Sequence, residues 1–232
     1  MLKDQYYRTT KFRGIIPFSG GIDSTAAVYR ILKANPSDNY VLFTVSLING
    51  TSATRSILEE KAVNEILQKL IRENISNFSF KKLSFDYSSL GPPPVWDSEI
   101  INFMASIIIQ DKPEITEFID GAIKDDYLQD GFSGRLDKIA DILYTTTGRN
   151  KEDLDILFPL KELTKYEVMS SIPSELLSLT WSCRYPEIGA PHTFVRCHKC
   201  PQCKVLDQVI LDHPGEFDHV EHLQPQAILS SL

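Results

Sequence analysis

A glycine-containing loop joins an apolar run to an amphipathic segment near the start of the chain, in the stretch IPFSGGIDST at residues 16–25. Residues 14–18 are predicted to form a buried strand, and residues 24–33 a helix whose apolar side chains recur at helical spacing. The adjacent Gly20 and Gly21 let the backbone take positive φ and approach a ligand with no Cβ in the way. A strand, a tight glycine loop and a helix in this order are typical of a parallel α/β sheet.

The same alternation of strand and helix continues through most of the sequence. Strands are expected at residues 40–47, 78–85, 115–119 and 156–159, and helices at residues 53–72, 97–109, 135–147 and 165–170. This order predicts an α/β fold, a doubly wound parallel sheet with helices on both faces. Such sheets bind ligands beyond the C-terminal strand ends, where the strand order reverses. The glycine loop follows the first strand, so a site is expected there.

The pattern changes near residue 180. Residues 1–180 are predicted to form the α/β domain, and residues 181–232 a smaller C-terminal segment with a helix at 204–213. A length of 232 residues is enough for one large domain with a small appendage.

Charge and hydropathy restrict the partners of the chain. The net charge of −7 disfavours a surface made for gripping nucleic acid backbones. The first 14 residues lack the apolar core of a signal peptide, and the longest apolar run is too short to cross a bilayer. We therefore expect a cytoplasmic protein with neither a membrane nor a nucleic acid as partner. A homodimer remains open.

The glycine loop is predicted to bind phosphate. Its amides and those of the first helical turn converge on one place, where the helix dipole also favours an anion. Asp23 could cap the helix or help to hold Mg²⁺ on the phosphates. The alternative is an ordinary serine–glycine turn with a capping Asp-Ser pair. The candidate nucleotide-binding residues of the loop are Phe18, Ser19, Gly20, Gly21, Ile22, Asp23, Ser24 and Thr25.

The loop fits neither G-x-G-x-x-G nor the Walker pattern, so dinucleotide and P-loop sites are disfavoured. Its S-G-G-x-D-S pattern resembles the PP-loop of the ATP pyrophosphatases. In that superfamily the loop binds the β- and γ-phosphates while a substrate atom attacks the α-phosphate. The resemblance implies release of pyrophosphate and formation of an adenylate.

A group of cysteines near the C-terminus predicts a structural zinc site. Zn²⁺ in structural sites prefers four soft ligands in a closed tetrahedron, and two overlapping C-x-x-C turns bring three thiolates together. The nearby His192 and His198 could substitute, and buried free thiols are the alternative. If zinc takes all four thiols, none is left to carry sulfur, which disfavours a tRNA-thiolating enzyme. The four predicted ligands are Cys183, Cys197, Cys200 and Cys203.

With both motifs in place, the chain resembles 7-cyano-7-deazaguanine synthase, the nitrile-forming enzyme of queuosine biosynthesis. The resemblance includes PFSGGIDST and the tail formed by LTWSC followed by C-x-x-C-x-x-C. Between them, DGAIKDDY at residues 120–127 and FPLKELTKYEV at residues 158–168 resemble two further family segments. The matching positions in those segments are Gly121, Asp126, Tyr127, Pro159, Leu160, Lys165 and Glu167.

The resemblance implies an adenine nucleotide alpha hydrolase-like fold and ATP-dependent adenylation of 7-carboxy-7-deazaguanine. Ammonia would then displace AMP to give an amide, and a second adenylation would give the nitrile. It also implies Mg²⁺ with the ATP, Gly121 at the nucleotide and Lys165 as the cation facing phosphate. A solvated lysine in a first helical turn is the plainer interpretation of Lys165. The implied catalytic residues are Asp23, Ser24, Asp126 and Lys165.

Departures from the family concentrate where substrate is expected to bind. Asn49-Gly50-Thr51 replaces Tyr-Gly-Gln, and Gln129-Asp130-Gly131-Phe132 lies where the family has P-D-C-R. The family's P-x-R-N becomes Pro94-Val95-Trp96-Asp97, which removes an arginine that could pair with an anion. Trp96 could stack on a base or simply pack. The interval between the first two cysteines is longer, so that residues 184–196 could form a new pocket wall.

Three functional hypotheses follow. The first is adenylation of the deazaguanine acid with amide and then nitrile formation. The second is transfer of the activated acyl group to another amine, for example on a protein partner in a modification or defence system. The third is a nucleotide-binding protein without catalysis, which the intact Ser19, Asp23 and Ser24 disfavour.

Overall fold

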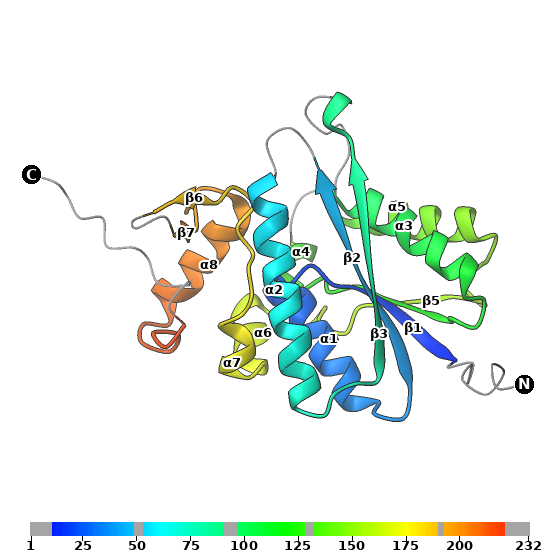
Figure 1. The fold of residues 1–232 in the computed structure, drawn as a ribbon, viewed down its shortest axis with the longest axis horizontal. Helices are drawn as coiled ribbons and strands as arrows, with labels where there is room; N and C mark the ends of the chain where they lie inside the picture. The colour runs from blue at the N-terminus through cyan, green and yellow to red at the C-terminus, as the bar shows by residue number, and fades with distance from the viewer. Residues whose placement is uncertain (1–10, 49–52, 91–96, 129–131, 190–192, 221–232) are drawn as a thin grey trace, which may run out of the picture.

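A parallel sheet forms the centre of the protein in the computed structural model, which describes residues 11–48, 53–90, 97–128, 132–189 and 193–220 (Figure 1). The sheet has five strands in the order β3-β2-β1-β4-β5, and every neighbouring pair is parallel. The strands are β1 (Phe12–Pro17), β2 (Asn39–Ile48), β3 (Phe78–Asp86), β4 (Glu117–Ile119) and β5 (Asp155–Leu157).

Helices cover both faces of this sheet (Figure 1). Successive residues of a strand point to opposite faces. Ile16 accordingly packs with α1 (Ile22–Ala34) and α2 (Ala53–Arg72), whereas its neighbour Ile15 packs with α3 and α5. The latter two helices are α3 (Asp97–Asp111) and α5 (Phe132–Thr147). The predicted doubly wound α/β fold is therefore confirmed, and its strand order reverses between β1 and β4.

Among the helices that begin earlier than their apolar pattern predicts are α1, α5 (Phe132–Thr147, predicted from residue 135) and α8 (Pro201–Asp212). Helix α1 starts at Ile22, with Gly21 as its N-cap and no side chain capping it, so the interpretation of Asp23 as the cap is wrong. Helix α8 starts with a proline at its first position, and Cys200 accepts a hydrogen bond from the Cys203 amide. In α1 and α8 the first turn includes polar residues, such as Asp23 and Gln202, that interrupt the apolar periodicity.

Several short elements have no counterpart in the sequence-based prediction. They span too few residues to display a period. They are η1 (Ser88–Leu90), α4 (Lys124–Tyr127), α7 (Ser174–Leu177), β6 (Glu187–Ile188) and β7 (Phe194–Val195). The last two pair as an antiparallel hairpin between the first and second cysteines.

The cysteine-containing segment packs onto the α/β core. Its four cysteines and Trp181 belong to the same buried cluster as Ile16, Phe18 and the inner side of α2. A second cluster joins α1, α6 (Lys165–Ser171) and α8. A domain boundary at residue 180 remains a prediction. Among the described residues, no helix is both long and apolar enough to cross a membrane.

Candidate functional site

A cavity of about 410 Å³ opens at the C-terminal ends of β1 and β4, where the strand order reverses. This is the position that the topology favours for a ligand, and the volume lies in the usual range for small-molecule sites. Phe18, Ser19, Asp23, Ser24 and Gly121 line it. Residues from β2, α2, α3, α4, α5, α6 and α8, together with Arg184, complete its walls.

The glycine loop lies against α2 at one side of this cavity. Gly20 has a φ of +73°, and a Cβ on it would lie 2.9 Å from the Cβ of Ala62 and 3.0 Å from the amide nitrogen of Val63. Only glycine meets both conditions. Ile22 and Thr25 are buried in the core and do not line the cavity, so their contribution to a nucleotide site is limited to backbone.

Serine hydroxyls accept hydrogen bonds from backbone amides of the loop. Gly21 donates its N–H to Ser19 Oγ at 3.3 Å, and Ser19 Oγ lies 3.0 Å from Ser24 Oγ. Ile22 donates its N–H to Ser182 Oγ at 3.2 Å. These amides belong to the first turn of α1, where no intrahelical acceptor exists, and they are the groups that bind anions at helix N-termini.

Lys165 brings a buried positive charge to the loop. Its side chain is 2% exposed, and Nζ lies 2.7 Å from both carboxylate oxygens of Asp23. The Thr164–Glu167 capping box fixes the start of α6, and the Lys165 amide donates to Asp125 Oδ2 at 2.7 Å. The interpretation of Lys165 as a solvated lysine is therefore wrong.

Carboxylates line the cavity beside this pair. Burial raises the pKa of Asp120 to about 6, and it also raises the pKa of Asp126. Asp120 Oδ1 accepts from the Ala122 amide at 2.9 Å, and Asp126 Oδ2 from the Ile123 amide at 3.0 Å. Carboxylate oxygens are the ligands that Mg²⁺ takes beside phosphates, so these groups could hold that ion.

Close approach explains the glycine that lies between these two acids in the sequence. A Cβ on Gly121 would lie 3.2 Å from the carbonyl oxygen of Asp23. Gly121 and Asp126 were predicted as site residues, whereas Asp120 was not. An acid at the C-terminal end of a buried strand was the signal available for it.

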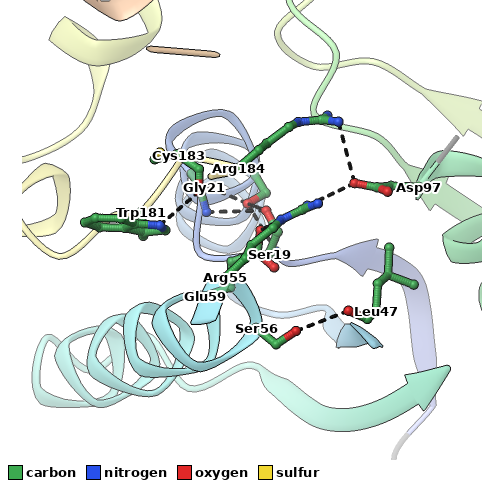
Figure 2. A network of polar contacts seen from close by, with 11 residues as sticks. Ser19, Gly21, Leu47, Arg55, Ser56, Glu59, Asp97, Trp181, Cys183 and Arg184 are labelled. Carbon is green, nitrogen blue, oxygen red and sulfur yellow. Dashed lines mark hydrogen bonds and ion pairs between the residues drawn. The ribbon is translucent and has the colours of Figure 1, made fainter. Parts of the chain in front are cut away.

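An ion-pair network forms another wall of the cavity (Figure 2). Arg55 Nε donates to Glu59 Oε1 at 2.7 Å, and its Nη2 donates to Asp97 Oδ2 at 2.9 Å. Arg184 Nη1 lies 3.7 Å from the same Asp97 oxygen. Burial raises the pKa of Glu59. We call Arg55, Glu59, Asp97 and Arg184 the charged wall.

The charged wall was largely missed by sequence reasoning. Arg55 and Glu59 have the i, i+4 spacing of an ordinary surface pair, which gives no reason to select them. Arg184 does line the cavity, in agreement with the expected wall from the longer interval between cysteines. Residues 49–51, 94–96 and 129–131, where the sequence differs from the family that it resembles, lie outside the described residues.

The four cysteines lie together in a buried cluster. One possible ligand atom from each lies within 4.8 Å of the others, and the sulfurs of Cys197 and Cys203 are 4.0 Å apart. Four thiolates around Zn²⁺ at the usual bond length would be separated by about 3.8 Å. The donor set and its spacing therefore fit a tetrahedral metal ion.

Histidine does not replace a thiol among the described residues. His198 Nδ1 lies 3.0 Å from both carboxylate oxygens of Asp207, and the described ligand cluster is made of cysteines alone. His192 lies outside the described residues. The fit is therefore to four sulfur ligands.

Comparison with solved structures finds several chains that are similar to this one. A solved structure described as a predicted subunit of tRNA methyltransferase from Methanocaldococcus jannaschii is 14% identical to this chain, with a TM-score of 0.40. The similarity covers 87% of this chain and 88% of the other. No protein family matches the chain, and no curated protein sequence matches it.

Proposed function

We propose that this protein is an ATP-dependent adenylating enzyme that transfers AMP to the carboxylate of 7-carboxy-7-deazaguanine. The observation that carries the proposal is the buried Lys165 ammonium on Asp23, beside the serine hydroxyls of the glycine loop. This arrangement lies where the strand order of the sheet reverses. The N-terminus of a helix at such a position favours binding of an anionic ligand. The S-G-G-x-D-S pattern supports ATP as that anion.

In the proposed reaction the loop binds the β- and γ-phosphates. The amides and the Ser19 and Ser24 hydroxyls donate to phosphate oxygens, while Lys165 neutralises charge. Asp23, Asp120 and Asp126 are the candidate holders of Mg²⁺. An oxygen of the substrate carboxylate attacks the α-phosphorus and the bond to the β-phosphate oxygen breaks, so pyrophosphate leaves. Binding and charge neutralisation carry this step, and no protein nucleophile is required.

The acyl adenylate then reacts with an amine. Ammonia adds to the carbonyl carbon, AMP leaves with the original carboxylate oxygen, and loss of a proton gives the amide. The amide oxygen attacks a second ATP, and departure of AMP with loss of the remaining protons gives the nitrile. Because Lys165 lies beside the loop, its positive charge neutralises phosphate charge in both adenylation steps.

The charged wall supports a second candidate, transfer of the acyl group to a different amine. Asp97 stands at a position where the resembled family has Asn, and it accepts contacts from both Arg55 and Arg184. The arginine missing from residues 94–97 is thus supplied by other segments. A charged wall with these different side chains favours a different acceptor for the acyl group. We propose that this acceptor is an amine on a protein partner.

The test is incubation of the purified protein with ATP, Mg²⁺, ammonia and 7-carboxy-7-deazaguanine, with reactions lacking the acid as control. AMP and pyrophosphate should appear together with a product of amide or nitrile mass. No nucleotide turnover with any deazaguanine acid would contradict the proposal, as would formation of ADP and phosphate.

The second candidate is tested by intact-mass measurement of candidate partner proteins after the same reaction. An adduct of the deazaguanine acyl mass is expected when a partner replaces ammonia. Complete conversion to nitrile with free ammonia, and no adduct on any partner, would contradict acyl transfer.

A further inference from the structure

Three consecutive residues connect the cysteine cluster to the glycine loop. The Trp181 amide donates to the Gly20 carbonyl at 2.9 Å, and Ser182 Oγ accepts from the Ile22 amide at 3.2 Å. The next residue, Cys183, is a member of the cluster. We call residues 181–183 the tether.

The tether lies in direct contact with the backbone of the loop. A Cβ on Gly21 would lie 3.4 Å from Ser182 Oγ and 3.6 Å from the Trp181 carbonyl oxygen. The Ile22 amide belongs to the first turn of α1, so Ser182 holds one of the groups that a helix N-terminus offers to an anion. Its hydroxyl orients the start of the helix from outside the loop.

The other end of the tether is fixed by the cysteines. Trp181 is buried, and its indole N–H donates to the Cys183 carbonyl at 3.1 Å, as Figure 2 shows. Cys183 Sγ accepts from the Cys197 amide at 3.3 Å. All the tether's apolar side chains belong to the buried cluster that includes Phe18, directly before the loop. Movement of the cysteines would therefore move the support of the loop.

We infer that Ser182 is a positioning residue for the nucleotide site, and that a metal ion on the four cysteines holds it against the Ile22 amide. Nucleotide affinity then depends on the metal, although the cysteines do not line the cavity. The inference rests on the proposed binding of ATP at the loop. It adds a role for the C-terminal segment that is distinct from folding alone.

The test is calorimetric titration of metal-loaded Ser182→Ala with Mg²⁺ and a non-cleavable ATP analogue, beside wild type and Ser182→Thr. Loss of one hydrogen bond of about 1.4 kcal/mol gives a Kd increase of roughly tenfold. Threonine keeps the hydroxyl and should restore most of the affinity. Metal content should stay at the wild-type value in both variants, and the Tm of Ser182→Ala should fall by only about 2 to 4 °C.

A Ser182→Ala Kd equal to or lower than that of wild type would overturn the inference. If wild type itself binds no nucleotide, the proposed function is contradicted. If wild type binds nucleotide and Ser182→Ala binds it equally well, only the inference about Ser182 is contradicted. The exposed Ser178 in the preceding segment offers the control substitution Ser178→Ala, which should leave the Kd unchanged.

Tryptophan emission gives a readout that does not depend on nucleotide. The chain has two tryptophans, so Trp96→Phe leaves Trp181 as the sole reporter. Chelation of the metal should shift the Trp181 emission to the red and weaken analogue binding at least tenfold, and added Zn²⁺ should reverse both changes. A chelated protein with altered Trp181 emission but undiminished nucleotide affinity would overturn the inference.

Discussion

The two sides of the cavity are built differently. The loop side is made of backbone amides, short hydroxyl side chains and one buried ion pair, all fixed by α1, α2 and α6. The charged wall is made of long side chains from α2, the start of α3 and the segment after Cys183. Phosphate recognition of this kind is tied to the fold, whereas acceptor recognition can change by side-chain substitution. Under the proposed function, ATP use would depend on the fold and the choice of acceptor on the charged wall.

Loss of the metal should disrupt both the loop side and the charged wall of the cavity. The reason is that segment 181–184 supplies Ser182 to the loop and Arg184 to the wall. Cys200→Ser should release the metal and lower the free energy of unfolding by about 4 kcal/mol or more, since metal binding is coupled to folding. Metal analysis and thermal unfolding measure the effect. Wild type stripped by a chelator is the matched control, and a variant that retains metal and stability would contradict the assignment.

Removal of the buried ammonium should damage the loop side alone. Lys165→Met is expected to lower kcat by about 10³-fold, because a charge directed at the transferring phosphates is lost, while the KM for the acceptor acid stays nearly unchanged. Steady-state kinetics with both substrates varied give the separation. Lys161→Met, at an exposed position nearby, is the control. A large change in acceptor KM with unaltered kcat would show that Lys165 acts on the acceptor and not on the phosphates.

Removal of one guanidinium should damage the wall alone. Among the described residues, Arg184 forms a 3.7 Å ion pair with Asp97, and a guanidinium carries five N–H donors, so further N–H groups of Arg184 can donate to an acceptor anion. Arg184→Ala should raise the acceptor KM by about 10- to 100-fold and leave ATP affinity unchanged. The control is Lys199→Ala, an exposed cation paired with Glu187. Weaker ATP binding with an unaltered acceptor KM would contradict the division between the two sides.

The smallest effect concerns Asp120, a half-buried acid that lines the cavity. Because burial raises the pKa of Asp120 from 3.8 to about 6, its protonated form favours folding below pH 4. That contribution is lost as the pH rises through 6. Asp120→Asn should therefore exceed wild type in stability by about 1 kcal/mol at pH 7.5, or roughly 2 to 4 °C in Tm.

Thermal unfolding between pH 4 and 7.5 checks this sign. The advantage of Asp120→Asn should disappear toward pH 4, where both proteins are uncharged at this position. The exposed Asp137→Asn should show no such trend. A variant that is less stable than wild type across the whole range would show that Asp120 is held as a favourable carboxylate.

The sequence was most informative where local spacing sets the geometry. The strand, glycine loop and helix around residues 16–25 were predicted from apolar spacing, and α2 was predicted with the ends that it has. The C-x-x-C turns brought three thiolates together because their spacing is local. The burial of Lys165 had no such signal, since a lysine in a first helical turn is normally solvated.

Contacts between distant segments could not be predicted. Ile22 and Ser182 are 160 positions apart, and the Arg184–Asp97 pair joins segments that no pattern links. Their proximity follows from how the C-terminal segment folds over α1 and α2, which is a property of packing. Apolar periodicity shows which face of a helix or strand is buried, but it does not show which distant segments pack against that face. The acceptor side was therefore the part of the site that the sequence left least defined.

The central claim is that a substrate carboxylate attacks the α-phosphate of ATP. Oxygen-18 in both carboxylate oxygens of 7-carboxy-7-deazaguanine tests it most directly, with mass spectrometry of the nucleotide products. One labelled oxygen is expected in the AMP of the first step, and one in the AMP of a second step when nitrile forms. Label in inorganic phosphate with formation of ADP, or AMP free of label, would contradict it.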